Sequence, residues 1–95
     1  MPAYILANIE VTDAADYEEY RRRAPPIIAA HGGRYLVRGG PVERLEGEGP
    51  LHRLVVLEFP DRARARAFYD SPDYQAIVGI RQRTSRGTLC IVDGV

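Results

Sequence analysis

The spacing of hydrophobic residues along the chain alternates between a period of two and a period near 3.6, which predicts strands interleaved with helices. In residues 4–11 every second position is apolar, as in a strand with one buried face: Ile5, Ala7, Ile9 and Val11. Residues 53–59 are apolar on both faces through their middle, which indicates a central strand. Residues 34–38 and 88–92 predict two further strands.

The first helical pattern follows Thr12 and Asp13, either of which can cap a helix. Its apolar stripe consists of Tyr17, Tyr20, Ala24, Ile27, Ile28 and His31. Pro25-Pro26 interrupts the pattern, because proline lacks an N–H donor and clashes with the preceding turn. We expect a kink or a restart there, which either follows the curvature of the sheet or opens a cleft beside the tyrosines. Gly32 or Gly33 supplies the left-handed residue that ends the helix.

The second helical pattern covers residues 62–69 after the cap Asp61 and restarts at Ser71. Serine is a favoured N-cap, and Pro72 in the first helical position gives up no hydrogen bond. The stripe that follows is Tyr74, Ile77, Val78 and Arg81.

Between the second and third strands the chain is rich in glycine. Gly39-Gly40-Pro41 ends the strand, residues 42–46 alternate and predict a hairpin or an extension of the sheet, and residues 47–50 form a turn. A phosphate-binding glycine loop opens a helix. This glycine segment instead precedes a proline and strand-like sequence, so it does not favour phosphate binding.

The predicted order of strand, helix, strand, strand, helix, strand is the α+β ferredoxin-like plan βαββαβ. In this plan both helices lie on one face of a four-stranded antiparallel sheet. The other face would expose an apolar row: Tyr4, Leu6, Leu36, Leu54 and Val56. Such a patch would be near or above the roughly 300–600 Å² found on ordinary monomers, so we predict a homodimer in which a second copy covers it.

The composition limits the classes of function. The 95 residues are expected to form a single domain, 1–95, and thirteen acidic residues balance thirteen basic ones. Without net positive charge we expect neither nucleic acid nor a membrane surface as a partner. Cys90, the only cysteine, excludes an internal disulfide and is expected in the core; a cytoplasmic, unexported protein fits this usage.

Two candidate catalytic residues are His31 and Tyr20. Imidazole titrates near neutral pH and suits proton transfer, with Tyr20 or Tyr74 as an orienting hydroxyl. The alternative role for His31 is to lie near the carbonyls at the helix C-terminus. The tyrosines form either an aromatic pocket or simply the core: Tyr17, Tyr20, Tyr35, Tyr69 and Tyr74.

Candidate ligand-binding residues lie on the predicted strands. Alternation in residues 34–38 puts Arg34 and Arg38 on one face, where a guanidinium could bind a carboxylate, and puts Tyr35 on the other. The alternative is that both arginines border a dimer interface and pair with Glu10 or Glu58. Asn8 of the first predicted strand is a further candidate ligand-binding residue, because a buried amide there must find partners among these same groups. The two histidines lack a carboxylate at ligand spacing, so we expect no metal site.

The sequence resembles a family known only as domain of unknown function 1330. The resemblance covers nearly the whole chain and is carried by four segments: residues 9–13, 31–40, 54–60 and 69–74. That family belongs to the dimeric α/β-barrel group, which includes cofactor-free monooxygenases, muconolactone-type isomerases and haem-binding enzymes. The resemblance implies the same fold and a dimer, with no established reaction. We expect a small-metabolite-binding dimer without a cofactor, either an enzyme of the monooxygenase or isomerase type or a non-catalytic sensing or accessory protein.

Overall fold

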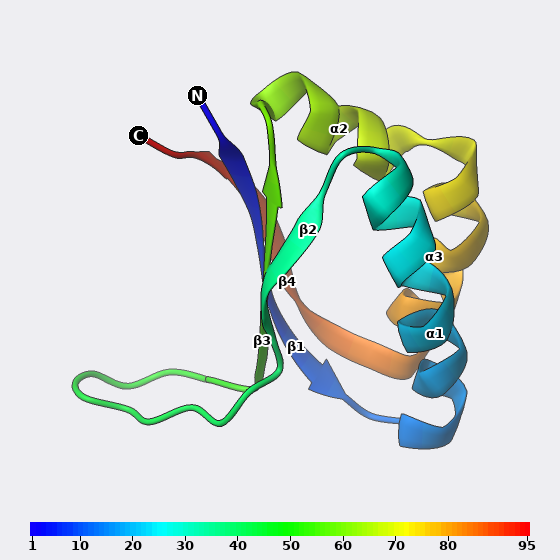
Figure 1. Cartoon of the computed structure of the whole chain (residues 1–95). Coiled ribbons are helices and arrows are strands. Elements are labelled where there is room, and N and C mark those ends of the chain that lie inside the picture. Colours follow the sequence, from blue (N-terminus) through cyan, green and yellow to red (C-terminus); the bar gives the residue numbers. More distant parts are fainter.

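In a computed structural model of residues 1–95, four strands form one antiparallel sheet and three helices cover one of its faces (Figure 1). The elements are β1 (Ala3–Val11), α1 (Ala14–Ala30), β2 (Arg34–Arg38), β3 (Arg53–Phe59), α2 (Arg62–Asp70), α3 (Pro72–Thr84) and β4 (Ser85–Asp93). The strand order is β2-β3-β1-β4. This arrangement confirms the predicted α+β, ferredoxin-like plan.

The core lies between the sheet and the helices. Ile5 and Ile9 of β1 are buried there, whereas Leu6 between them faces the other side of the sheet. The buried cluster also contains Phe59, Phe68, Tyr74 and Ile77. Burying a large apolar side chain stabilises a fold by about 1.5–3 kcal/mol, so this cluster holds the helices on the sheet.

Helix α1 begins at the cap Asp13, whose side chain accepts a hydrogen bond from the Asp16 N–H. The helix then continues through Pro25 and Pro26, so the predicted restart does not occur. Pro25 leaves the Arg21 carbonyl without its usual donor four residues ahead. Arg38 Nη2 of β2 donates to that carbonyl at 2.9 Å. A side chain of the sheet thus replaces the helical hydrogen bond that Pro25 removes.

Helix α1 ends at the glycine pair, as the sequence predicted. Gly32 has φ +80°, and its N–H donates to the Ala29 carbonyl at 3.0 Å. The Gly33 N–H donates to the Ile28 carbonyl at 2.9 Å, which completes a Schellman motif. The predicted restart between α2 and α3 is also confirmed: the Ser71 hydroxyl accepts from the Tyr74 N–H, and Pro72 opens α3.

Strand β2 contains a bulge that changes which residues share a face. Tyr35 lies opposite Leu57, but two residues later Val37 lies opposite Val56, so the register shifts between them. As a result Tyr35 and Arg38 both face the helices. Arg34 faces away from them. The prediction that Arg34 and Arg38 share a face was therefore wrong, because simple alternation takes no account of an inserted residue.

Residues 39–52 form a long loop that projects from the sheet on the side away from the helices (Figure 1). The strand predicted at 42–46 is absent. Gly47 and Gly49 have positive φ, and Arg44 donates to the Gly47 carbonyl at 3.0 Å, so the loop folds on itself instead of pairing with a strand. Asn8 holds the base of the loop: its amide donates to the Pro50 carbonyl and accepts from the His52 N–H, both at 2.9 Å.

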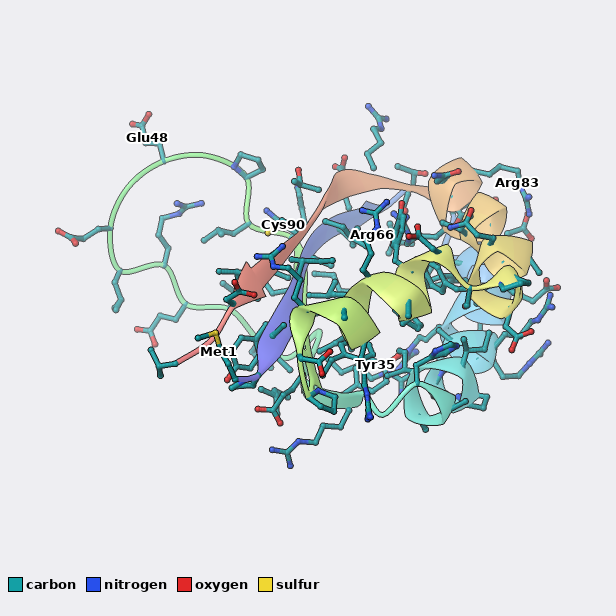
Figure 2. The ribbon with its side chains drawn as sticks, turned by 90° about the horizontal axis from the view of Figure 1, so that it is seen from above. Met1, Tyr35, Glu48, Arg66, Arg83 and Cys90 are labelled. Carbon is teal, nitrogen blue, oxygen red and sulfur yellow. The ribbon has the colours of Figure 1, made fainter.

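The face of the sheet opposite the helices is apolar and uncovered in the single chain. Leu6, Val37 and Val92 retain 38, 42 and 42% of their exposure. Cys90 is also exposed there, so the prediction that it belongs to the core was wrong; it pairs with Leu6, on the opposite parity to the buried Ile5. Figure 2 shows Cys90 on the side of β4 toward the loop that carries Glu48. We call this surface the open face.

Candidate functional site

A cavity of about 50 Å³ lies between the sheet and helices α1 and α3. Most of its wall is apolar and includes Ile5, Ala7, Ile9, Val55, Leu57 and Leu89. A water molecule needs roughly 10–15 Å³ in such a measure, and a cavity that holds benzene has about 150 Å³. The cavity therefore has room for a chemical group of a few non-hydrogen atoms.

Two tyrosine hydroxyls meet at this cavity. Tyr20 of α1 and Tyr74 of α3 are hydrogen-bonded at 2.7 Å between their hydroxyl oxygens. Their rings approach edge to face with centroids 6.1 Å apart. Burial, reinforced by the neighbouring Tyr74, raises the pKa of Tyr20 well above its ordinary value. Tyr20 therefore stays protonated at neutral pH and can act only as a hydroxyl donor or acceptor.

Arg81, also on α3, extends this polar group. Its Nε donates to the Tyr74 hydroxyl at 3.3 Å, and the residue is only 9% exposed. Burial by itself would lower the pKa of Arg81, but the interaction with Tyr74 outweighs it and the net change is upward. Arg81 is thus a buried cation whose side-chain partner is a tyrosine and not a carboxylate.

Tyr35 and Arg38 complete the polar wall on the β2 side. The Arg38 guanidinium lies over the Tyr35 ring, 4.7 Å from its centroid. Burial raises the pKa of Tyr35, and the charge of Arg38 partly opposes that change. Both side chains reach the cavity because of the bulge in β2.

Arg53, the first residue of β3, contributes a donor that nothing in the chain satisfies. Its Nε is buried and has no hydrogen-bond partner. Any side chain at Gly39 would collide with its guanidinium, so the glycine at the end of β2 makes room for Arg53. Buried N–H groups are nearly always paired, so this one stands out.

The structure brings together four of the predicted site residues, Tyr20, Tyr35, Arg38 and Tyr74, and leaves three elsewhere. His31 caps the C-terminus of α1 with its ring edge-on to Phe68, centroids 6.0 Å apart, and lines a shallow groove outside the cavity. Arg34 pairs with Glu58 at 2.7 Å on the open face, which confirms one of the pairings expected for it. Asn8 holds the loop. His31 and Tyr20 therefore do not share a site.

Sequence reasoning missed Arg21, Arg53 and Arg81, which also line the cavity. For Arg81 a signal existed, because it continues the Tyr74, Ile77 and Val78 stripe and a charged residue on a buried stripe is unusual. Arg53 likewise shares its strand face with Val55 and Leu57. His, Cys, Asp and Glu side chains form no group of three that could hold a metal ion. No helix has the length and apolar character to cross a membrane.

Four antiparallel strands in the order β2-β3-β1-β4, with the helices on one face of the sheet (Figure 1), define a ferredoxin-like α+β protein. Within that class, the chain belongs to the family described as a domain of unknown function, DUF1330, whose model matches residues 2–95. No curated protein matches the sequence.

Solved structures share the fold at low sequence identity. A protein of unknown function from Rhodopseudomonas palustris has a TM-score of 0.80 and 19% identity, with 99% of this chain and 82% of that chain covered. A dimeric ferredoxin-like protein of unknown function from Jannaschia has 0.67 and 16%, with 99 and 100% covered. SnoaB, a cofactor-independent oxygenase from Streptomyces nogalater, has 0.68 and 13%, with 99 and 93% covered. These similarities establish the fold.

Proposed function

We propose that this protein is a cytoplasmic homodimer that binds a small metabolite in the cavity between sheet and helices. The observation that carries the proposal is a group of hydrogen-bonding side chains, Tyr20, Tyr74 and Arg53, at a cavity whose wall is mostly apolar. Ligand sites typically combine an apolar wall with a few polar groups that orient the ligand. A core built only for stability has no use for an unpaired guanidinium N–H.

The dimer rests on the open face. Its exposed apolar side chains are those that a second sheet would cover, including Leu6, Val37 and Val92. When two such faces pack about a two-fold axis, each subunit covers the open face of the other and the assembly is closed. The Jannaschia protein, of the same fold, is described as dimeric.

Two functional roles fit such a cavity. The first is catalysis without a cofactor, of the monooxygenase or isomerase type, in which Tyr20 or Tyr74 orients the substrate; the Streptomyces nogalater oxygenase has the same fold. Here a proton carrier at His31 would need to act from outside the cavity, so unchanged turnover in His31→Ala would exclude it from the reaction. The second role is non-catalytic, in which the cavity senses a metabolite or the dimer is an accessory protein.

Native mass spectrometry of freshly purified protein tests the proposal. We expect a dimer, and a discrete additional mass identifies any metabolite that the protein retains. The purified protein is then screened against small polar metabolites by NMR, following the amides of Ala7, Val55 and Leu89 around the cavity. A monomer would contradict the dimer. A bare protein whose cavity amides respond to none of the compounds would contradict metabolite binding.

A further inference from the structure

The charged side chains around the cavity are all of one sign. Four arginines line it, Arg21, Arg38, Arg53 and Arg81, and no aspartate or glutamate does. Arg21 pairs with Glu18 on the surface of α1 at 3.4 Å. The other three form no ion pair with any carboxylate of the chain. The cavity therefore carries positive charge that the protein does not neutralise.

The orientation of Arg53 strengthens this point. Its strand position opposite Ile9 points the side chain toward the helices, and its Nε is buried without an acceptor. In this position the guanidinium lies where a Cβ at residue 39 would collide with it, and Gly39 has none. The partly buried Arg53 side chain thus lies on the helix side of the sheet. Arg34 on the neighbouring strand β2 faces the other side and pairs with Glu58.

The tyrosine pair leaves a second donor unused. Tyr20 and Tyr74 together carry two hydroxyl protons, and their mutual hydrogen bond uses one of them. Arg81 Nε is a donor in its hydrogen bond to the Tyr74 oxygen, so Arg81 cannot accept the second hydroxyl proton. The remaining hydroxyl proton has no acceptor within the protein, whichever tyrosine carries it.

We propose that the cavity is the binding site of a small organic carboxylate, whose oxygens accept hydrogen bonds from the Arg53 guanidinium and the unused tyrosine proton. The inference rests on the proposed metabolite-binding function and specifies its ligand class. A carboxylate group and a short carbon chain fit the volume of about 50 Å³. A larger substituent leaves the cavity beside the exposed Arg21 and Arg38.

The test compares propionate with propionamide, which has nearly the same shape and no charge, by ¹H–¹⁵N NMR titration at constant ionic strength. We expect propionate to bind at least tenfold more tightly, because hydrogen bonds to charged groups are about twice as strong as neutral ones. We expect it to move the Arg53 Nε–H resonance, which is assigned by its loss in Arg53→Gln.

Arg53→Gln should weaken propionate binding about tenfold or more and leave propionamide binding nearly unchanged. Arg23→Gln is the matched control: Arg23 lies on the outer surface of α1, pairs with Glu19, and should not affect either ligand. If Arg53→Gln fails to fold, the double variant Tyr20→Phe/Tyr74→Phe removes the hydroxyl donor instead. It should weaken the binding of propionate more than that of propionamide, because a hydrogen bond to a charged acceptor is the stronger one.

Equal binding of propionate and propionamide at the cavity amides would overturn the carboxylate assignment and leave metabolite binding intact. Propionate binding that Arg53→Gln does not weaken would also overturn it. If neither compound moves the cavity resonances, the carboxylate assignment fails, and the native mass spectrum and the wider screen decide the proposed function separately.

Discussion

The Arg38 guanidinium on β2 donates to the Arg21 carbonyl of α1 at 2.9 Å, in place of the N–H that Pro25 lacks. We expect Arg38→Met to destabilise the fold by about 1 kcal/mol, a modest value because Arg38 is exposed. In a Pro25→Ala background the helix supplies its own N–H, so the same change should cost less. Urea unfolding of the four proteins gives the coupling energy, and a coupling of zero would mean that Arg38 does not compensate for the proline.

The buried Tyr20 predicts a loss of stability in alkali. Burial raises its pKa in the folded protein above the value of 10.0 expected when it is unfolded. Below about pH 10 both states keep the proton. As the pH rises further the unfolded chain releases it first, and the free energy of unfolding falls by up to about 1.4 kcal/mol per pH unit for this group.

Urea unfolding between pH 8 and 11.5, followed by circular dichroism, checks this slope. Tyr20→Phe removes the titrating group, so the stability of that variant should fall less steeply above pH 10. Identical slopes for the variant and the wild type would show that the folded protein does not hold this proton.

We expect the side chain of Asn8 to stabilise the long loop, residues 39–52. Asn8→Ala removes the hydrogen bonds to the Pro50 carbonyl and the His52 N–H, at a cost of about 1–2 kcal/mol. The amide of His52 should then exchange with deuterium faster, together with its neighbours in residues 39–52. Thr88→Ala is the control, since Thr88 of β4 lies opposite Asn8 of β1 and neither hydrogen bond at the base of the loop involves it. Unchanged loop exchange in Asn8→Ala would contradict the role given to Asn8.

At Gly33, between α1 and β2, the surrounding side chains leave no room for a Cβ atom. A Cβ there would lie 2.5 Å from the Phe59 ring and 2.9 Å from Ile28, both fully packed, so Gly33→Ala should destabilise the fold by about 1–3 kcal/mol. A Cβ at Gly40 meets no atom within 4 Å, and Gly40→Ala should change stability by less than about 0.5 kcal/mol. Chemical denaturation compares the two, and equal effects would mean that the packing around Gly33 yields freely.

Cys90 reports whether the open face is covered. It is the only cysteine and is exposed in the single chain. In the proposed dimer its thiol should react slowly with Ellman's reagent. Leu6→Glu places a charge beside it on the same face and should give a monomer whose thiol reacts at least tenfold faster, with size-exclusion chromatography following the change of mass. Rapid reaction in the wild type would argue against a dimer through this face.

Local signals in the sequence predicted most of the fold. The alternation of residues 4–11, the Ser71-Pro72 start of α3 and the glycines after His31 each depend on neighbouring residues, so the chain itself determines them. The same reasoning failed at residues 42–46, where no strand forms, and at Pro25, where the helix does not restart. The partner of a strand lies far away in the chain, and so does Arg38, the donor to the carbonyl that Pro25 leaves free.

The candidate site was predicted in part. Tyr20, Tyr35 and Tyr74 were visible as aromatic residues on patterned elements, and Arg38 as a strand arginine. Only the tertiary structure decided that the bulge in β2 moves Arg38 away from Arg34, that Arg53 points inward without a partner, and that His31 lies outside the cavity. Each of these depends on strand register and helix packing, which bring together residues far apart in sequence and which periodicity alone does not specify.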